Sequence, residues 1–161
     1  MSGSPTRQKN RAGTVLLVDD SDQLRRFATQ ILSEEGFDVL EAIDAEEGIA
    51  MYRQRADSID LVVTDIHMPG KSGLELADYV SSRNSDLPLL FISSHSPEVL
   101  YRIFASTREF LSKPFRADAL VHKVRKLIGT TETASAFQNR AMDSETASVS
   151  SAAGSPVHSS S

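Results

Sequence analysis

Residues 60–73 read "DLVVTDIHMPGKSG": an apolar β-branched run, one acid, and a loop that contains Pro-Gly-Lys-Ser-Gly. The apolar run predicts a buried strand, and the proline and glycines predict a turn directly after it. Asp65 therefore lies where the predicted strand ends and the loop begins. What this carboxylate can do depends on which other side chains reach the same place.

The sequence on both sides of this stretch alternates between strand and helix patterns. Short apolar runs predict strands within residues 14–20, 37–42, 58–65, 86–94 and 109–112. Apolar residues at helical spacing, with capping residues before them, predict helices that begin near residues 21, 44, 72, 96 and 117. Five strand–helix pairs in this order predict a doubly wound α/β fold, (βα)5, with a parallel five-stranded sheet between two helix layers.

The first predicted helix has clear boundaries. Ser21 or Asp22 provides its N-cap, and Gly36 stands where a helix C-terminus favours a left-handed residue. The helical spacing predicts one apolar face, which consists of Leu24, Phe27, Ala28, Ile31 and Leu32.

Composition excludes several classes of function. The chain has 161 residues, a net charge of −5 and no cysteine, so disulfides, cysteine-bound zinc and a thiol nucleophile are excluded. The chain lacks the cluster of lysine and arginine residues that is typical of proteins that bind nucleic acids. No apolar run approaches the roughly 18 residues of a membrane span, and the N-terminus lacks the apolar segment of a secretory signal. We therefore expect a cytoplasmic protein without a membrane partner.

Composition also predicts the domain boundaries. Residues 130–161 are rich in serine, threonine and alanine and contain few large apolar side chains. Such a segment buries too little surface to offset the entropy of ordering it, so we predict a disordered C-terminal tail. Residues 1–13 have the same character. The predicted folded domain is residues 14–129.

Reactive side chains lie at the carboxyl ends of four of the five predicted strands. They are Asp19 and Asp20, Asp65, Ser93, and Lys113. Because ligands of such folds bind beyond the carboxyl ends of the strands, these groups are expected to converge there. Carboxylate oxygens are the ligands that Mg²⁺ prefers, a carboxylate can attack phosphorus to form an acyl phosphate, and a lysine can neutralise the transferring group. The pattern therefore predicts phosphoryl transfer.

Four motifs in this order resemble the receiver domains of two-component response regulators: "VDD", "TDIHMPGKSG", "FISS" and "SKPF". The resemblance covers residues 14–129 and implies the flavodoxin-like strand order 2-1-3-4-5. It also implies that Asp65 is the phosphoacceptor. Mg²⁺ would be bound directly by Asp20 and Asp65, through water by Asp19, and by the backbone carbonyl of His67.

The resemblance assigns three further roles. Lys113 would pair with the phosphoryl group, Ser93 would be the switch hydroxyl, and Phe110 would occupy the aromatic switch position. Two simpler interpretations stay open, because Ser93 can be an ordinary strand-end cap and Phe110 a core residue of an edge strand.

His67 and His95 each follow a site residue by two positions. Both are expected to border the path of the water that hydrolyses an aspartyl phosphate. Since imidazole changes charge near neutral pH, we predict that these two side chains tune the phosphoryl lifetime between about pH 6 and 8. The alternative is that both rings point to solvent without effect.

The leading hypothesis is a single-domain response regulator that is not an enzyme beyond phosphorylation from small donors and slow self-dephosphorylation. It would be phosphorylated by a sensor histidine kinase or a histidine phosphotransfer protein, and would act through an unknown output protein or as a relay intermediate. "LPLLFISS" and "FLSKPF" look most like the terminal receivers of hybrid histidine kinases. "ASTRE", residues 105–109, departs from the small residues common there in the family, so the output surface is expected to differ.

Three other functions would require different residues. A phosphatase of the haloacid dehalogenase type would carry an acid two residues after Asp65, where this chain has His67. A pseudo-receiver that only binds a partner would not need the complete set of acids with Ser93 and Lys113. Flavin binding would need a glycine- and hydroxyl-rich phosphate loop after the first strand, where "DDSDQ" would repel phosphate.

Overall fold

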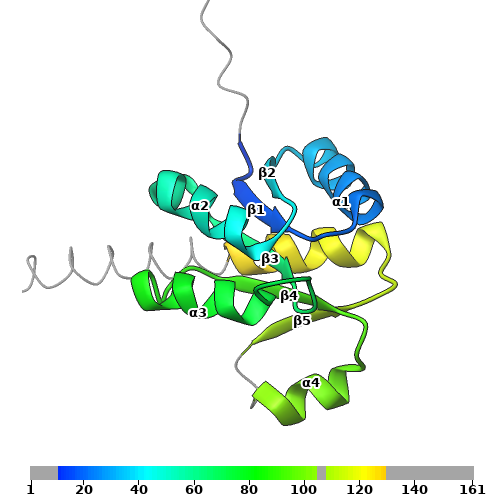
Figure 1. The fold of residues 1–161 in the computed structure, drawn as a ribbon. Helices are drawn as coiled ribbons and strands as arrows, with labels where there is room; N and C mark the ends of the chain where they lie inside the picture. Colours follow the sequence, from blue (N-terminus) through cyan, green and yellow to red (C-terminus); the bar gives the residue numbers. More distant parts are fainter. Residues whose placement is uncertain (1–10, 105–107, 130–161) are drawn as a thin grey trace, which may run out of the picture. The chain divides into compact units, whose positions relative to one another are not determined.

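The computed structural model describes residues 11–104 and 108–129 (Figure 1). In chain order the elements are β1 (Thr14–Val18), α1 (Asp22–Glu34), β2 (Asp38–Ala42), α2 (Ala45–Arg55), the 3₁₀ helix η1 (Ala56–Ser58), β3 (Leu61–Asp65), α3 (Gly73–Arg83), β4 (Leu89–Ser93), α4 (Pro97–Phe104) and β5 (Glu109–Ser112). A final helix follows over residues 117–129. All five predicted strands and all five predicted helices are present.

The five strands form one sheet in the order β2-β1-β3-β4-β5, and every neighbouring pair is parallel. The doubly wound fold and the strand order 2-1-3-4-5 are therefore confirmed. The chain reverses its direction of winding between β1 and β3, which pair with Val18 opposite Thr64. Ligands of such sheets bind beside this switch point, at the carboxyl ends of the two central strands.

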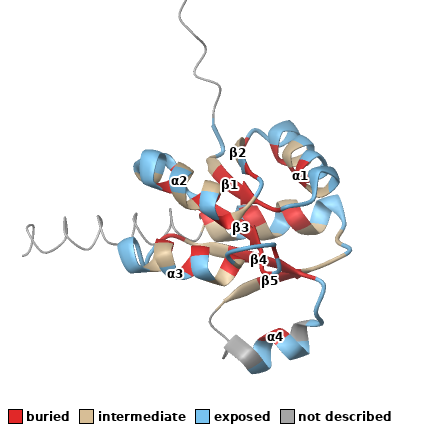
Figure 2. Cartoon of the chain, viewed as in Figure 1, coloured by how far each residue is buried: buried red, intermediate tan, exposed pale blue. Residues whose placement is uncertain are grey.

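Apolar side chains fill both faces of the sheet, and Figure 2 shows that burial is concentrated in the central strands β1, β3 and β4. On one face, α1 and the final helix pack through Ala28, Leu32, Leu120 and Val124. On the other face, α2 and α3 pack through residues such as Tyr52 and Leu76, and Leu100 of α4 joins Phe91 and Phe110. Continuous burial explains why the central strands are apolar throughout rather than alternating.

Side-chain caps set the starts of the helices that lead away from the site. The Ser21 side chain accepts from the Leu24 N–H, so Ser21 rather than Asp22 is the N-cap of α1. At α3 the Ser72 Oγ accepts from the Glu75 N–H, and the Glu75 carboxylate accepts from the Ser72 N–H at 2.7 Å. This reciprocal capping box fixes where α3 begins relative to β3. Gly36 has φ +92° after α1, as predicted.

Two local predictions were wrong. Phe27 was placed on the buried face of α1, yet it is 45 % exposed, while Arg25 is buried. The helix turns its Ala28 and Leu32 side to the sheet, and the Phe27 ring lies beside Phe115 with 6.1 Å between centroids. Ser58 was placed in a strand but ends η1 instead.

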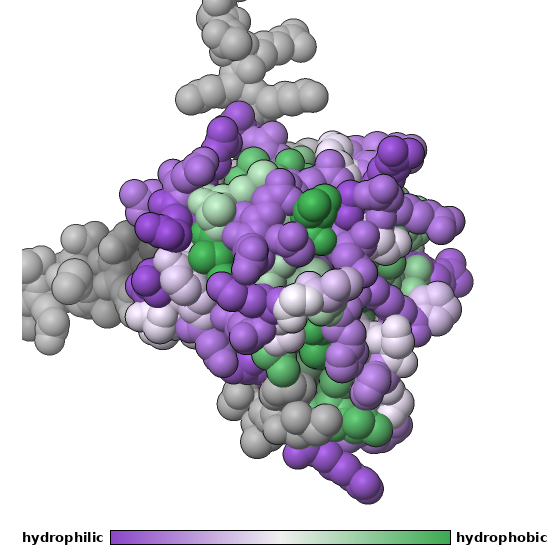
Figure 3. All heavy atoms as spheres, in the orientation of Figure 1, coloured by the Kyte–Doolittle hydropathy of each residue, from purple (hydrophilic) through white to green (hydrophobic). Residues whose placement is uncertain are grey.

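The surface of the described residues is mostly hydrophilic, as Figure 3 shows for one face. Hydrophobic atoms appear in small areas near the centre and near the bottom of that view. Among the described residues, the large apolar side chains that are exposed are Phe27, Ile43, Val99 and Tyr101. In the described ranges, no helix combines the length and the apolar character needed to cross a membrane.

The predicted tails, residues 1–13 and 130–161, lie outside the described residues except for residues 11–13. There the Ala12 N–H donates to the Gly36 carbonyl at 3.2 Å, and Arg11 pairs with Asp38 at 2.8 Å. The disorder predicted for the two tails stays a prediction.

Candidate functional site

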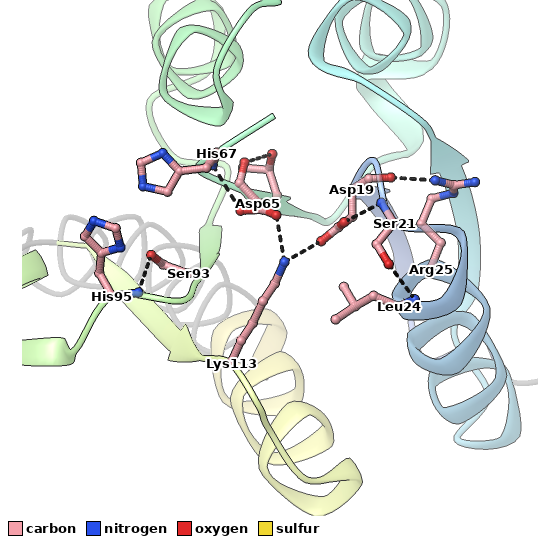
Figure 4. Close-up of polar contacts among 10 residues, drawn as sticks. Asp19, Ser21, Leu24, Arg25, Asp65, His67, Ser93, His95 and Lys113 are labelled. Carbon is pink, nitrogen blue, oxygen red and sulfur yellow. Dashed lines mark hydrogen bonds and ion pairs between the residues drawn. The ribbon is translucent and has the colours of Figure 1, made fainter. Parts of the chain in front are cut away.

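Side chains from β1, β3 and β5 meet at the carboxyl edge of the sheet (Figure 4). Asp19 directly follows β1, Asp65 is the last residue of β3, and Lys113 directly follows β5. Asp19 is fully buried and Asp65 is 5 % exposed, although both are acids. Buried carboxylates are costly unless they are paired and hydrogen-bonded, so their partners define the site.

Lys113 lies between the two buried acids. Its Nζ is 2.7 Å from Asp65 Oδ2 and 3.2 Å from Asp19 Oδ2, and donates a hydrogen bond to each. These contacts join strand ends that are 48 and 94 residues apart in the sequence. One ammonium thus offsets part of the repulsion between two carboxylates.

Burial has opposite consequences for the acid and the base. Burial raises the pKa of the Asp19 carboxyl, and the Ser21 N–H and the Lys113 ammonium act against this rise without cancelling it. Burial alone would lower the pKa of Lys113, but the hydrogen bond from its ammonium to Asp65 and the charges of both acids outweigh burial and raise it. Lys113 is therefore a permanent cation at neutral pH.

Backbone N–H groups hold the other oxygen of each acid. The Ser21 N–H donates to Asp19 Oδ1 at 2.8 Å, and the His67 N–H donates to Asp65 Oδ1 at 3.0 Å. Each carboxylate is thereby oriented with Oδ1 toward the loop and Oδ2 toward Lys113. Both bonds link residues two positions apart, so the turn after each strand sets the rotamer.

The third acid differs from the other two. Asp20 is exposed, and it makes no hydrogen bond or ion pair within the described part of the chain. Carboxylate oxygens of Asp19, Asp20 and Asp65 nevertheless lie within 4.8 Å of one another. Three such oxygens form an all-oxygen donor set, which fits a hard cation such as Mg²⁺. The predicted acidic cluster is therefore present.

Ser93 ends β4 and is fully buried. Its Oγ accepts from the His95 N–H at 3.1 Å, while its carbonyl accepts from the Lys113 N–H at 2.8 Å. The first contact agrees with the strand-end cap interpretation, and the second fixes β5 beside β4. Its role as a switch hydroxyl stays a prediction.

Phe110 lies in β5 and is buried. Its ring is 5.7 Å from the Phe91 ring and 5.9 Å from the Tyr101 ring, edge to face with the latter. Phe110 is thus part of the core under α4, in agreement with the simpler interpretation. The switching role of Phe110 stays a prediction.

His67 and His95 come together at the rim of the site. Their ring centroids are 4.8 Å apart with 33° between the planes, and both residues are exposed. The rings face each other rather than lying separately in solvent, as Figure 4 shows. Their effect on phosphoryl lifetime stays a prediction.

Gly73, the first residue of α3, had no predicted role. A Cβ placed there would lie 1.9 Å from the Asp65 carbonyl oxygen, and the same carbonyl accepts from the Thr64 hydroxyl at 3.0 Å. Only glycine allows α3 to begin this close to the end of β3. Gly73 is the last residue of the stretch 60–73, but its position in the sequence does not reveal how close it lies to the Asp65 carbonyl.

Arg25 was also missed. Its guanidinium is buried and its Nη1 donates to the Asp19 carbonyl at 2.7 Å. An arginine at a polar helix position gives no sequence signal for burial, because its partners come from other segments.

A family model of the response regulator receiver domain matches residues 15–125. DctD of Rhizobium meliloti, a C4-dicarboxylate transport transcriptional regulatory protein, is 35% identical over 117 residues, which are 71% of this chain. The chain spans about a quarter of that protein's length, since the match covers 25% of it. Chemotaxis protein CheY1 of Helicobacter pylori is 29% identical, and the match covers 73% of this chain and 98% of CheY1.

A crystal structure of the receiver domain from the hybrid histidine kinase CckA is similar to this one. The TM-score is 0.62 at 31% identity, and the match covers 72% of this chain and 99% of that domain. The similar proteins thus include both a regulator of transcription and a hybrid kinase. The chain belongs to the family of response regulator receiver domains.

Proposed function

We propose that Asp65 accepts a phosphoryl group from a phosphohistidine, on a sensor histidine kinase or a histidine phosphotransfer protein. Receiver domains of two-component systems are phosphoacceptors for such proteins and are not generally classed as enzymes. The observation that carries the proposal is the Lys113 ammonium held by Asp65 and Asp19, next to a third acid. The phosphorylated domain would act as a switch for a protein contact or as a relay intermediate.

In phosphoryl transfer the protein contributes mainly by positioning the reacting groups and by stabilising their charge. A carboxylate oxygen of Asp65 forms a bond to phosphorus while the phosphorus–nitrogen bond of the donor breaks, and the electron pair stays on the donor imidazole. The product is an acyl phosphate. The His67 N–H orients the Asp65 carboxylate before transfer. Lys113 is positioned to pair with the phosphoryl oxygens afterwards, as a charge-assisted donor.

Mg²⁺ would be held by Asp19, Asp20 and Asp65, with the backbone carbonyl of His67 as a further ligand. When bound, it would supply positive charge that neutralises the transferring group. The fit rests on three carboxylates whose oxygens lie within 4.8 Å of one another. Without a bound cation, the negative charges of the three carboxylates are only partly balanced by the positive charge of Lys113.

The switch would begin at Ser93. Its Oγ is an acceptor for the His95 N–H, which leaves the hydroxyl proton free to be donated to a phosphoryl oxygen. A movement of Ser93 would disturb β4 and the neighbouring rings of Phe91 and Phe110. Because Tyr101 of α4 lies against Phe110, the disturbance would reach an exposed helix.

Nuclear magnetic resonance can test whether phosphorylation of Asp65 changes the surroundings of Ser93 and Phe110. Acetyl phosphate with Mg²⁺ should shift the amide resonances of Ser93 and Phe110 in the wild type, and should shift neither in Asp65→Asn. Ser93→Ala should still become phosphorylated but leave the Phe110 resonance close to its starting position. Wild-type shifts at Phe110 in Ser93→Ala would rule out Ser93 as the switch.

No second function has an observation in its favour. In a haloacid dehalogenase phosphatase, a side chain two residues after the nucleophile acts as the acid and base. Here that residue is His67, whose ring lies against His95 and whose backbone N–H contacts Asp65. The two rings at the rim would instead limit the approach of water to the phosphorylated carboxylate, and so lengthen the life of the phosphoryl group.

A further inference from the structure

Among the described residues, five polar or charged side chains are buried: Asp19, Arg25, Thr64, Asp65 and Ser93. Four of them form the candidate site or adjoin it in sequence. Arg25 is the fifth, and it comes from the second turn of α1. A buried guanidinium requires a specific set of acceptors, so its contacts indicate what it does.

Arg25 connects three segments at the edge of the site. Its Nη1 donates to the Asp19 carbonyl at 2.7 Å, and its Nη2 pairs with Asp22 in the first turn of α1. Its Nε lies 4.0 Å from a carboxylate oxygen of Glu41 in β2. The contact with Asp19 is therefore to the backbone, and the carboxylate of Asp19 is left to Lys113 and Ser21.

The Asp19 carbonyl lies just beyond the paired part of β1. The Asp19 N–H still donates to the Ala42 carbonyl at 3.2 Å, but the paired strand itself ends at Val18. Arg25 supplies the donor that the carbonyl needs. This carbonyl belongs to the peptide bond between Asp19 and Asp20, so its orientation sets the direction in which both side chains leave the backbone.

Among the described residues, Asp20 makes no hydrogen bond or ion pair that would fix its side chain. Its position depends on the peptide that Arg25 holds. We propose that Arg25 is a positioning residue for divalent cation binding, because it orients the Asp19–Asp20 peptide so that both carboxylates face the cation site. This inference rests on the proposed Mg²⁺ site, and it concerns the affinity of that site.

A purely electrostatic role for Arg25 predicts the opposite sign. A positive charge near a cation site weakens cation binding by repulsion, so its removal would tighten the binding of Mg²⁺. Loss of a positioning contact instead weakens binding, because the chain must order the ligands at the moment of binding. Outer contacts of this kind typically change metal affinity by about 10- to 100-fold.

The experiment is a Mg²⁺ titration of the full chain, followed through the amide resonances of Asp20 and His67. Wild type, Arg25→Met and Arg25→Lys are compared, after circular dichroism has shown that each is folded. Asp22→Asn is the matched control, because it removes a partner of Arg25 and leaves the contact with Asp19. We expect at least about 10-fold weaker Mg²⁺ binding in both Arg25 variants and little change in Asp22→Asn.

A second readout separates affinity from chemistry. At saturating Mg²⁺, the rate of phosphorylation by acetyl phosphate should return close to the wild-type rate in the Arg25 variants. Equal or tighter Mg²⁺ binding in folded Arg25→Lys or Arg25→Met would overturn the positioning role. Absence of Mg²⁺ binding in the wild type would overturn the proposed function itself, so the two failures are distinguishable. If Arg25→Met does not fold, Arg25→Lys decides, since it keeps the charge and loses the planar fork.

Discussion

The Nζ of Lys113 donates to Asp65 Oδ2 at 2.7 Å, between strand ends that lie 48 residues apart in the sequence. The same ammonium reaches Asp19, so both buried acids depend on one cation from β5. A phosphoryl group on Asp65 would attract this ammonium as well. Lys113 thus couples the chemistry at β3 to the position of β5.

Lys113→Ala should bind Mg²⁺ but lose most of the phosphorylation-dependent change at Phe110, because the phosphoryl charge loses its partner. The metal-free protein should also be less stable, by about 3 kcal/mol, since two buried acids lose their ion-pair partner. Resonance shifts and urea unfolding measure these effects. Lys123→Ala, which removes the ion pair with Glu109 instead, is the control. A wild-type response in Lys113→Ala would contradict the assignment.

Gly73→Ala should disrupt the site from the start of α3. The added Cβ would meet the Asp65 carbonyl oxygen, which belongs to the backbone and cannot rotate away. We expect a loss of stability of about 2 to 3 kcal/mol and weaker Mg²⁺ binding. Gly129→Ala is the control, because a Cβ there meets nothing within 4 Å. Denaturant unfolding that leaves Gly73→Ala as stable as Gly129→Ala would show that the contact is unimportant.

Glu109 gives a pH-dependent test of how β5 is held to the final helix. The Lys123 ammonium hydrogen-bonds to this carboxylate and, with Lys126, lowers the pKa of Glu109. Because the pKa of Glu109 is lowered on folding, its ionised carboxylate stabilises the fold at pH values above the ordinary carboxyl pKa of 4.5. This contribution to stability is lost as the pH falls through the lowered pKa of the folded state.

Glu109→Gln should therefore destabilise the protein at neutral pH by about 1 kcal/mol or less, and the difference from wild type should vanish in acid. Thermal unfolding at several pH values measures it. Asp118→Asn removes the exposed pair with Arg116 and should have no effect. A difference that grows as the pH falls would have the wrong sign.

The ring pair of His67 and His95 should slow the loss of the phosphoryl group. The combined variant His67→Asn with His95→Ala opens the rim, so the aspartyl phosphate should decay several-fold faster. His122→Ala, an exposed histidine on the final helix, is the control. The measurement is the decay of phosphorylated protein after the donor is removed. Equal decay rates in the variant and the wild type would end this interpretation.

The fold could be predicted because its signals are local. Apolar runs located the strands, and Ser21, Asp44 and Ser72 marked helix starts whose caps the structure contains. The convergence of Asp19, Asp65 and Lys113 followed from one rule, that the carboxyl ends of parallel strands share an edge.

What the sequence did not show depends on contacts between distant segments. Phe27 fits an apolar helix face by spacing, yet the rotation of α1 against the sheet leaves it exposed. From the sequence alone Arg25 resembles an exposed residue of the helix surface, and only the structure reveals its buried contact with the Asp19 carbonyl. The contact between the His67 and His95 rings depends on the conformations of two loops and on two side-chain rotamers, and the sequence spacing determines neither.

If Asp65 is the phosphoacceptor, the phosphoryl group must be found on its carboxylate. The protein is incubated with acetyl phosphate and Mg²⁺, the acyl phosphate is reduced with borohydride, and the modified residue is identified by tandem mass spectrometry. We expect modification at Asp65 alone, with none in Asp65→Asn or when EDTA replaces Mg²⁺. Stoichiometric modification at another residue, or undiminished modification of Asp65 in EDTA, would contradict it.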